Sequence, residues 1–79
     1  MYVVNVAKAR VFRLKESVDP NAFFASHEDY RKCDDPPSMD VIEDWIFDGE
    51  CEATDGCIVE PDGHCPHGHP SWLIVVGAI

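Results

Sequence analysis

The chain has 79 residues, of which 46% are hydrophobic, with four cysteines and a formal net charge of −9 at pH 7. A domain this short buries only about 60% of its unfolded surface, so such domains often add a metal, a disulfide or a partner. The apolar run at residues 72–79 is too short to span a bilayer, and the first residues lack the features of an export peptide. We expect one cytoplasmic domain over residues 1–79, in which clustered cysteines bind metal or act as redox thiols sooner than form disulfides.

In chain order, residues 2–14 fit both a helical face and a strand, and their β-branched and aromatic content favours a strand. Asp19 and Pro20 are typical of a helix start and predict a short helix over residues 21–32. Three ring-bearing residues would then share one side of this helix: Phe23, His27 and Tyr30. We expect these three side chains to pack in the core, and we favour this over metal binding by His27.

The clearest predicted helix covers residues 38–48. Ser38 is a suitable N-cap, and Gly49 is a suitable residue at which to end the helix. Four apolar residues fall on one face: Met39, Ile42, Trp45 and Ile46. The pattern predicts a core-facing stripe with a solvated acidic back. The alternative is a partner-binding site made by Asp40, Glu43, Asp44 and Trp45, with Phe47 beside the tryptophan.

Charge is segregated along the sequence. Residues 1–15 hold four basic residues and no acid, whereas residues 33–79 hold eleven acids and no lysine or arginine. Because nucleic-acid binding needs cations facing the phosphates, direct nucleic-acid binding by the acidic part is excluded. Two interpretations stay open: acids that only keep a small protein dispersed, and an acidic face that docks on a basic protein partner.

Residues 49–69 hold three of the four cysteines and three of the four histidines. Turn residues at 55–56 and 61–63 predict a hairpin that brings Cys57 and Cys65 together, and the spacing from Cys65 to His69 is common in zinc sites. The preferred metal ligands are Cys51, Cys57, Cys65 and His69, with His67 as the alternative to His69. Cys33 lies outside this segment and is expected to be a spare surface thiol.

Thiolate and imidazole ligands favour one structural Zn²⁺ over calcium or magnesium, and the sequence leaves zinc versus iron open. An enzymatic alternative has zinc on three residues only, with water in the fourth position and a carboxylate as base. Three acids in the segment could then serve as that base: Asp55, Glu60 and Asp62.

Three short motifs, ATDGC, VEPDG and CPHGHPSWL, follow one another over residues 53–73. With Cys51 placed before Cys57 and five residues between the two, they resemble a group of small uncharacterised prokaryotic proteins that end in a C-x5-C…CPHGHPSWL motif. The resemblance covers about the last third of the chain and implies that its cysteines and histidines act as a unit. More loosely, the Cys-Pro-x-Gly-His loop resembles the zinc knuckles of zinc-ribbon and treble-clef proteins, whose ligand pairs are closer than Cys51 and Cys57.

The sequence therefore predicts a small, metal-stabilised α+β fold. A strand and a short helix occupy residues 1–32, a helix covers residues 38–48, and residues 49–79 form a zinc-knuckle-like segment whose apolar end packs against Trp45. The expected function is a non-enzymatic zinc-binding interaction module or a small subunit of a larger complex, with a protein partner and no membrane. The alternatives are an acidic inhibitor that mimics nucleic acid, of the type made by mobile elements, and a small zinc or thiol enzyme.

Overall fold

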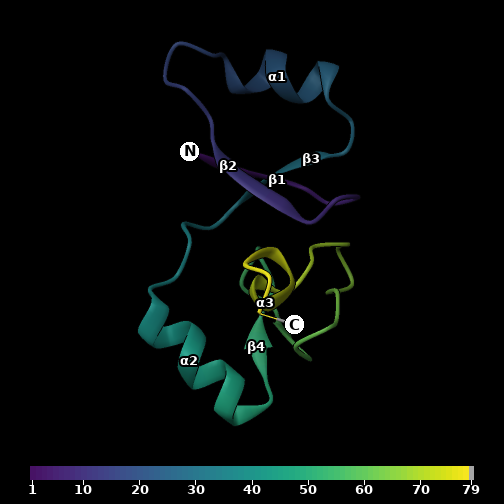
Figure 1. Ribbon diagram of the computed structural model, residues 1–79. Helices are drawn as coiled ribbons and strands as arrows, with labels where there is room; N and C mark the ends of the chain where they lie inside the picture. The colour runs from purple at the N-terminus through teal and green to yellow at the C-terminus, as the bar shows by residue number, and fades with distance from the viewer. Residues whose placement is uncertain (79) are drawn as a thin grey trace.

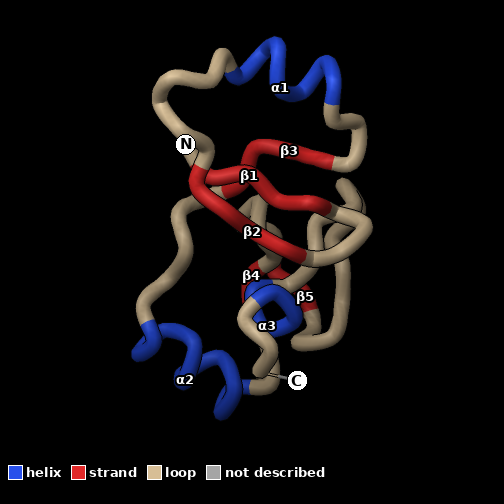
Figure 2. The backbone as a smooth tube through the Cα atoms, turned by 45° about the horizontal axis from the view of Figure 1, so that its top comes forward, coloured by secondary structure: helices blue, strands red, loops and turns tan. Residues whose placement is uncertain are grey.

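The computed structural model describes residues 1–78, which form three helices and two small antiparallel sheets (Figure 1). In chain order the elements are β1 (Tyr2–Asn5), β2 (Arg10–Arg13), α1 (Pro20–Ser26), β3 (Tyr30–Cys33), α2 (Met39–Asp48), β4 (Cys51–Glu52), β5 (Ile58–Val59) and α3 (Trp72–Val75). The molecule measures 39 × 23 × 17 Å, with α1 at one end of the long axis and α2 at the other (Figures 1 and 2). The small α+β class is confirmed. Among the residues described, no helix has the length and apolar character needed to cross a membrane.

The first sheet has the order β2-β1-β3, and β1 pairs antiparallel with both neighbours. The strand predicted over residues 2–14 is a hairpin of two strands. The turn forms because the Asn5 side-chain oxygen accepts hydrogen bonds from the backbone N–H groups of Ala7 and Lys8, both at 3.0 Å. Ala9 completes the reversal with a φ of 54°. The strand type was predicted and the turn was not.

Helix α1 begins as predicted and ends early. The Asp19 side chain accepts a hydrogen bond from the Asn21 backbone N–H, and Pro20 fills the first helical position. The helix stops at Ser26, so the prediction of helix through residue 32 is wrong. The physical reason is pairing with a distant segment, because residues 30–33 form β3 along the free edge of β1.

One face of this sheet packs against α1 through aromatic side chains. Phe23 of α1 makes edge contacts with Phe12 and Tyr30, with ring centroids 6.2 and 5.3 Å apart. The exposed His27 ring stacks on Phe23 at 4.2 Å. The three predicted residues do contact one another, but the prediction of core packing is wrong: Phe23 and Tyr30 are half-buried, His27 is exposed, and Tyr30 comes from a strand.

The other face of the sheet contributes Val4 and Cys33 to a core shared with the rest of the chain. The remaining buried members come from α2, β4 and α3: Ile42, Cys51, Trp72 and Leu73. Trp45 packs against this core, so the expectation that the C-terminal apolar segment packs near Trp45 is confirmed for residues 72–75. Ile79 lies outside the described residues.

Cys33 is a core residue rather than a surface thiol. Its exposed fraction is 7%, because it alternates along β3 toward the shared core. Burial, followed by the negative charges of Asp34 and Asp35, raises the pKa of its thiol to about 11.

Helix α2 has the predicted bounds and caps. The Ser38 side chain accepts a hydrogen bond from the Val41 backbone N–H, and Gly49 ends the helix with a φ of 70°. The predicted core-facing stripe is narrower than expected. Ile42 is buried and Trp45 is half-buried, whereas two residues of the stripe are exposed, Met39 at 68% and Ile46 at 51%. Strand β4 and helix α3 make the main element contacts with this helix, and most of its residues are exposed.

The C-terminal third contains little regular structure. Strand β5 pairs with β4, placing Cys51 opposite Val59, so the strands of the hairpin predicted between Cys57 and Cys65 do not pair with each other. The turn in that hairpin is confirmed, because the Gly63 N–H donates to the Glu60 carbonyl at 2.9 Å. From Glu60 to Ser71 the chain forms turns and isolated bridges between β5 and α3.

Candidate metal centre

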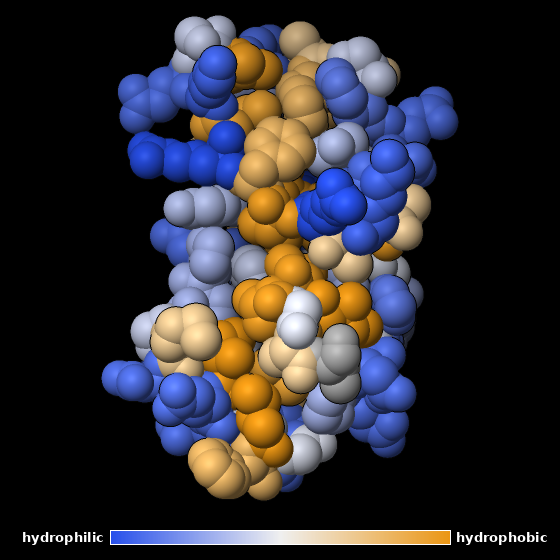
Figure 3. All heavy atoms as spheres, in the orientation of Figure 1, coloured by the Kyte–Doolittle hydropathy of each residue, from blue (hydrophilic) through white to orange (hydrophobic). Residues whose placement is uncertain are grey.

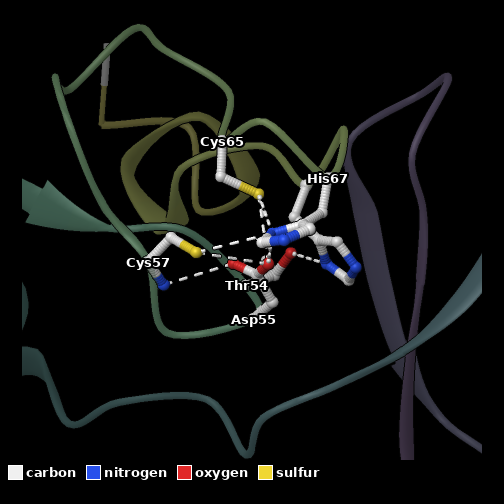
Figure 4. Close-up of polar contacts among 6 residues, drawn as sticks. Thr54, Asp55, Cys57, Cys65 and His67 are labelled. Carbon is white, nitrogen blue, oxygen red and sulfur yellow. Dashed lines mark hydrogen bonds and ion pairs between the residues drawn. The ribbon is translucent and has the colours of Figure 1, made fainter.

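Four potential metal ligands converge in the C-terminal third: Asp55, Cys57, Cys65 and His67. Their ligand atoms all lie within 4.8 Å of one another. Asp55 and Cys57 come from the turn between β4 and β5, and Cys65 and His67 come from the loop before α3. Figure 4 shows these side chains pointing toward one another from the two loops.

Glycine-assisted turns shape both loops. In the first, the Gly56 N–H donates to the Ala53 carbonyl at 2.9 Å with a φ of 91°, a conformation that favours glycine. In the second, the Gly68 N–H donates to the Cys65 carbonyl at 2.9 Å with a φ of 85°. Each turn presents two ligands separated by one residue, as Asp-x-Cys and Cys-x-His. The site is thus built from two close pairs.

Five of the six distances between the donor atoms are close to those of tetrahedral coordination. The sulfurs of Cys57 and Cys65 each lie 3.6 Å from Nδ1 of His67. Oδ2 of Asp55 lies 3.5 Å from the Cys57 sulfur, 3.1 Å from the Cys65 sulfur and 3.0 Å from Nδ1 of His67. Around a tetrahedral zinc ion, sulfur lies about 3.6 Å from nitrogen or oxygen, and nitrogen lies about 3.4 Å from oxygen. The observed separations agree to within about half an ångström of these values.

Hydrogen bonds keep the carboxylate of Asp55 ionised. Burial raises its pKa, but hydrogen bonds donated by the Cys65 thiol and the Cys57 backbone N–H outweigh burial. The nearby His69 acts in the same direction, so the pKa lies below the usual value. The carboxylate also forms an ion pair with His67 at 3.0 Å when that ring is protonated.

The Cys57 thiol holds its proton in the absence of a cation. Desolvation and the adjacent Asp55 carboxylate raise the pKa of Cys57 to about 11. A metal ion that binds here therefore displaces protons, as is general for thiolate ligands. The His67 side chain is 67% exposed, which gives an ion access from solvent.

The structure brings together only part of the predicted ligand set. Cys57 and Cys65 belong to the group, and His67, the alternative fourth ligand, takes the place of His69. Cys51 is 1% exposed in the shared core, where its thiol donates to the Glu60 carbonyl at 3.8 Å. Its position on β4 turns the side chain toward the core and away from the loops.

His69 is likewise not one of the four donors, although it lies near enough to Asp55 to lower the pKa of that carboxyl. It is 7% exposed, and its Nδ1 lies 2.9 Å from the hydroxyl oxygen of Thr54. Burial, as the largest cause, lowers its pKa, so the neutral ring is favoured. The turn at Gly68 separates His67, which faces the centre, from His69, which packs beneath it. The contact between His69 and Thr54 stabilises the loop, and His69 is not among the candidate metal ligands.

Asp55 is the ligand that sequence reasoning missed, since it was considered only as a base in an enzymatic site. Its spacing could have identified it, because Asp55-x-Cys57 repeats the one-residue gap of Cys65-x-His67, and each pair has a turn glycine within it or directly after it. The residues predicted to bind a partner all lie on α2. Three of them are exposed acids, Asp40, Glu43 and Asp44, and the fourth, Trp45, is half-buried.

Comparisons with protein families, with curated proteins and with solved structures find no match for this chain. The proposals below therefore depend on the geometry and charge of the molecule itself.

Proposed function

We propose that the chain is a non-enzymatic interaction module or small subunit whose C-terminal loops are held by one structural zinc ion. Its ligands are Asp55, Cys57, Cys65 and His67. The observation that carries the proposal is the convergence of these four donors at tetrahedral separations. Two thiolates and an imidazole favour zinc over calcium and magnesium, which take oxygen ligands.

Zinc would crosslink loops that have little regular hydrogen-bonded structure to stabilise them. Residues 60–71 contain no helix or extended strand pairing, and the ligands link this segment to the β4–β5 turn. Structural zinc sites contribute about 10–16 kcal/mol of apparent binding free energy at neutral pH, which acts as folding free energy. Four protein ligands also complete a tetrahedral shell, which favours a structural over a catalytic role.

An acidic surface on the same part of the chain supports docking on a basic protein. Nine of the eleven acids after residue 32 are exposed: Asp34, Asp35, Asp40, Glu43, Asp44, Asp48, Glu50, Glu60 and Asp62. Within residues 1–78 the one ion pair is that of His67 with Asp55, so these nine carboxylates have no cationic side chain on them. Free carboxylates on one part of a small protein favour a cationic partner.

The same surface supports a second candidate, an acidic inhibitor that occupies a nucleic-acid-binding groove. The two candidates differ in their dependence on salt. A complex held mainly by charge dissociates steeply as salt rises to about 0.5 M, whereas an interface with a substantial apolar part persists. Recovery of the partner at low and high salt separates them.

Native mass spectrometry of the zinc-reconstituted chain tests the metal. We expect one zinc per chain, and cobalt substitution should give a tetrahedral spectrum with charge-transfer bands from two thiolates. A matched pair of variants tests the ligand set, because Cys57→Ser removes a proposed ligand and Cys33→Ser removes a thiol outside the centre. The proposal fails if no metal binds, or if Cys33→Ser and Cys57→Ser lose zinc equally.

A further inference from the structure

A small hollow of about 120 Å³ lies at the C-terminal end of α2, and none of the four candidate metal ligands lines it. It is lined by Trp45, Asp48, Glu50, Cys51 and Ile58, and we refer to it as the α2 pocket. Sites for small organic ligands run to about 300–1,000 Å³, so the α2 pocket fits one extended side chain and not a whole ligand.

The walls of the pocket combine apolar surface with carboxylates. Trp45 is half-buried and Ile58 is 64% exposed, so an indole and an aliphatic side chain form the apolar part. Asp48 and Glu50 are both exposed, and neither is in an ion pair with another described residue. No lysine or arginine occurs anywhere after residue 32, so this chain offers no nearby cation to them.

The helix end adds to the negative potential. The last turn of α2 contains no basic residue, and the backbone N–H of Gly49 caps only the Trp45 carbonyl. Carbonyl groups at the C-terminal end of a helix carry a partial negative charge of about half a unit, which favours a cation. The helix end and the two carboxylates therefore act together on whatever enters the pocket.

We propose that the α2 pocket binds one lysine or arginine side chain of a protein partner. The methylene groups lie against Trp45 and Ile58, and the cationic end lies between the carboxylates of Asp48 and Glu50. An indole attracts a cation through its ring face, and long basic side chains bury their stems on apolar surface with the charge at the rim. This inference deepens the proposed interaction function and rests on it, because it names the chemistry of the partner.

The surroundings favour a protein over a free metal or small cation. A divalent cation prefers a shell of six or more oxygens, which two carboxylates beside an indole do not supply. Val41 lies one helical turn before Trp45 on the same side of α2 and is 38% exposed. Apolar side chains also form a band along the visible face that continues to the end of the molecule holding α2 (Figure 3). A protein partner would cover this apolar surface beside the pocket.

The test uses the full zinc-loaded chain, labelled with ¹⁵N, and three short blocked peptides: Gly-Arg-Gly, Gly-Lys-Gly and the uncharged isostere Gly-citrulline-Gly. We expect the arginine and lysine peptides to shift the indole N–H signal of Trp45 saturably. Trp72 is only 3% exposed and should not respond. The citrulline peptide should produce no saturable shift, because it has the shape of arginine without the charge. Equal shifts from all three peptides, or no saturable shift, would overturn the proposal.

Two double variants with the same charge change complete the test. Asp48→Asn with Glu50→Gln should weaken arginine-peptide binding at least tenfold. Asp40→Asn with Glu43→Gln, nearer the N-terminal end of α2 and outside the pocket lining, should weaken it less than twofold. Equal weakening of peptide binding by the two double variants would show that the peptide responds to the net charge of the protein. That result would overturn the proposal of a binding pocket.

The controls separate this proposal from the zinc proposal. Zinc content and the dispersion of the amide spectrum are measured on each sample before peptide is added. A dispersed spectrum with no bound zinc would contradict the metal and leave the peptide result valid for the pocket. A Trp45 shift that grows with protein concentration alone would identify a second copy as the occupant and contradict a separate basic partner.

Discussion

The two halves of this molecule are held together in different ways. In the N-terminal half, residues 1–33, backbone pairing in a three-stranded sheet and ring contacts with α1 stabilise the structure. In the C-terminal half, residues 34–78, the strands are two residues long and a chain of turns carries the metal ligands. The first half balances six basic residues against four acids, whereas the second has eleven acids and no lysine or arginine.

The difference shows that the two halves of a 79-residue chain are stabilised by different kinds of interaction. A sheet with a covering helix supplies hydrogen bonds and apolar contacts to its own residues. Loops that lack ladder pairing require a crosslink among side chains, and this crosslink uses the same residue types that bind zinc. Val4 and Cys33 join the halves, because they lie in the core with Trp72 and Leu73. In the proposed function, the exposed acids outside the candidate metal centre face a basic partner.

Of the tests below, metal removal should have the largest effect, and it should destabilise the C-terminal half more than the N-terminal half. Chelation of zinc removes about 10 kcal/mol or more of folding free energy, which exceeds the stability of many small domains. We expect amide protection to vanish first in residues 49–71 and to persist longer in β1, whose N–H groups are paired on both sides. Hydrogen exchange followed by mass spectrometry measures both regions. Simultaneous loss of protection in both would show one cooperative unit.

A pair of substitutions on α2 tests how that helix is attached. Ile42→Ala leaves a cavity in the shared core, where Ile42 is 2% exposed, and should cost about 2–5 kcal/mol of unfolding free energy. Met39→Ala, at a site 68% exposed on the same helix, should change it by less than about 0.5 kcal/mol. Urea unfolding of the zinc-loaded variants gives both values. Equal effects would mean that the core does not hold α2.

A pair of exposed histidines tests the ligand set. His67→Asn removes a proposed ligand and should weaken zinc binding by at least about 100-fold, more than the loss of an outer-shell partner usually costs. His64→Asn alters an exposed histidine in the same loop that is not among the four donors and should leave zinc affinity unchanged. Competition with a chromophoric chelator measures both. A zinc affinity that survives His67→Asn and falls in His69→Asn would restore the ligand set first predicted.

The smallest effect concerns the thiol at the junction of the halves. The folded pKa of Cys33 is about 11, above its ordinary value of 9.0. Its stabilising contribution is therefore complete below about pH 9 and is lost as pH rises toward 11, because the unfolded thiol ionises first. Cys33→Ala should lessen the fall in stability between pH 8 and pH 10, as measured by urea unfolding at both values. An unchanged slope would show that this thiol does not contribute to it.

Local features were determined by the sequence alone. Asp19 and Ser38 begin helices and Gly49 ends one, because a cap acts on backbone groups within a few residues of itself. The pairing of Cys57 with Cys65 in one group was likewise predictable, since turn residues flank both.

Only the tertiary structure decided which cysteines and histidines face the proposed ion. Residues 30–33 could continue a helix by local preference, but the free edge of β1 draws them into a strand. Cys51 has a ligand's chemistry and enters the core, and His69 turns toward Thr54 while His67 faces Asp55. These choices depend on contacts between segments far apart in the chain, whose free energies residue spacing does not encode. Spacing limits which donors can meet, and packing selects those that do.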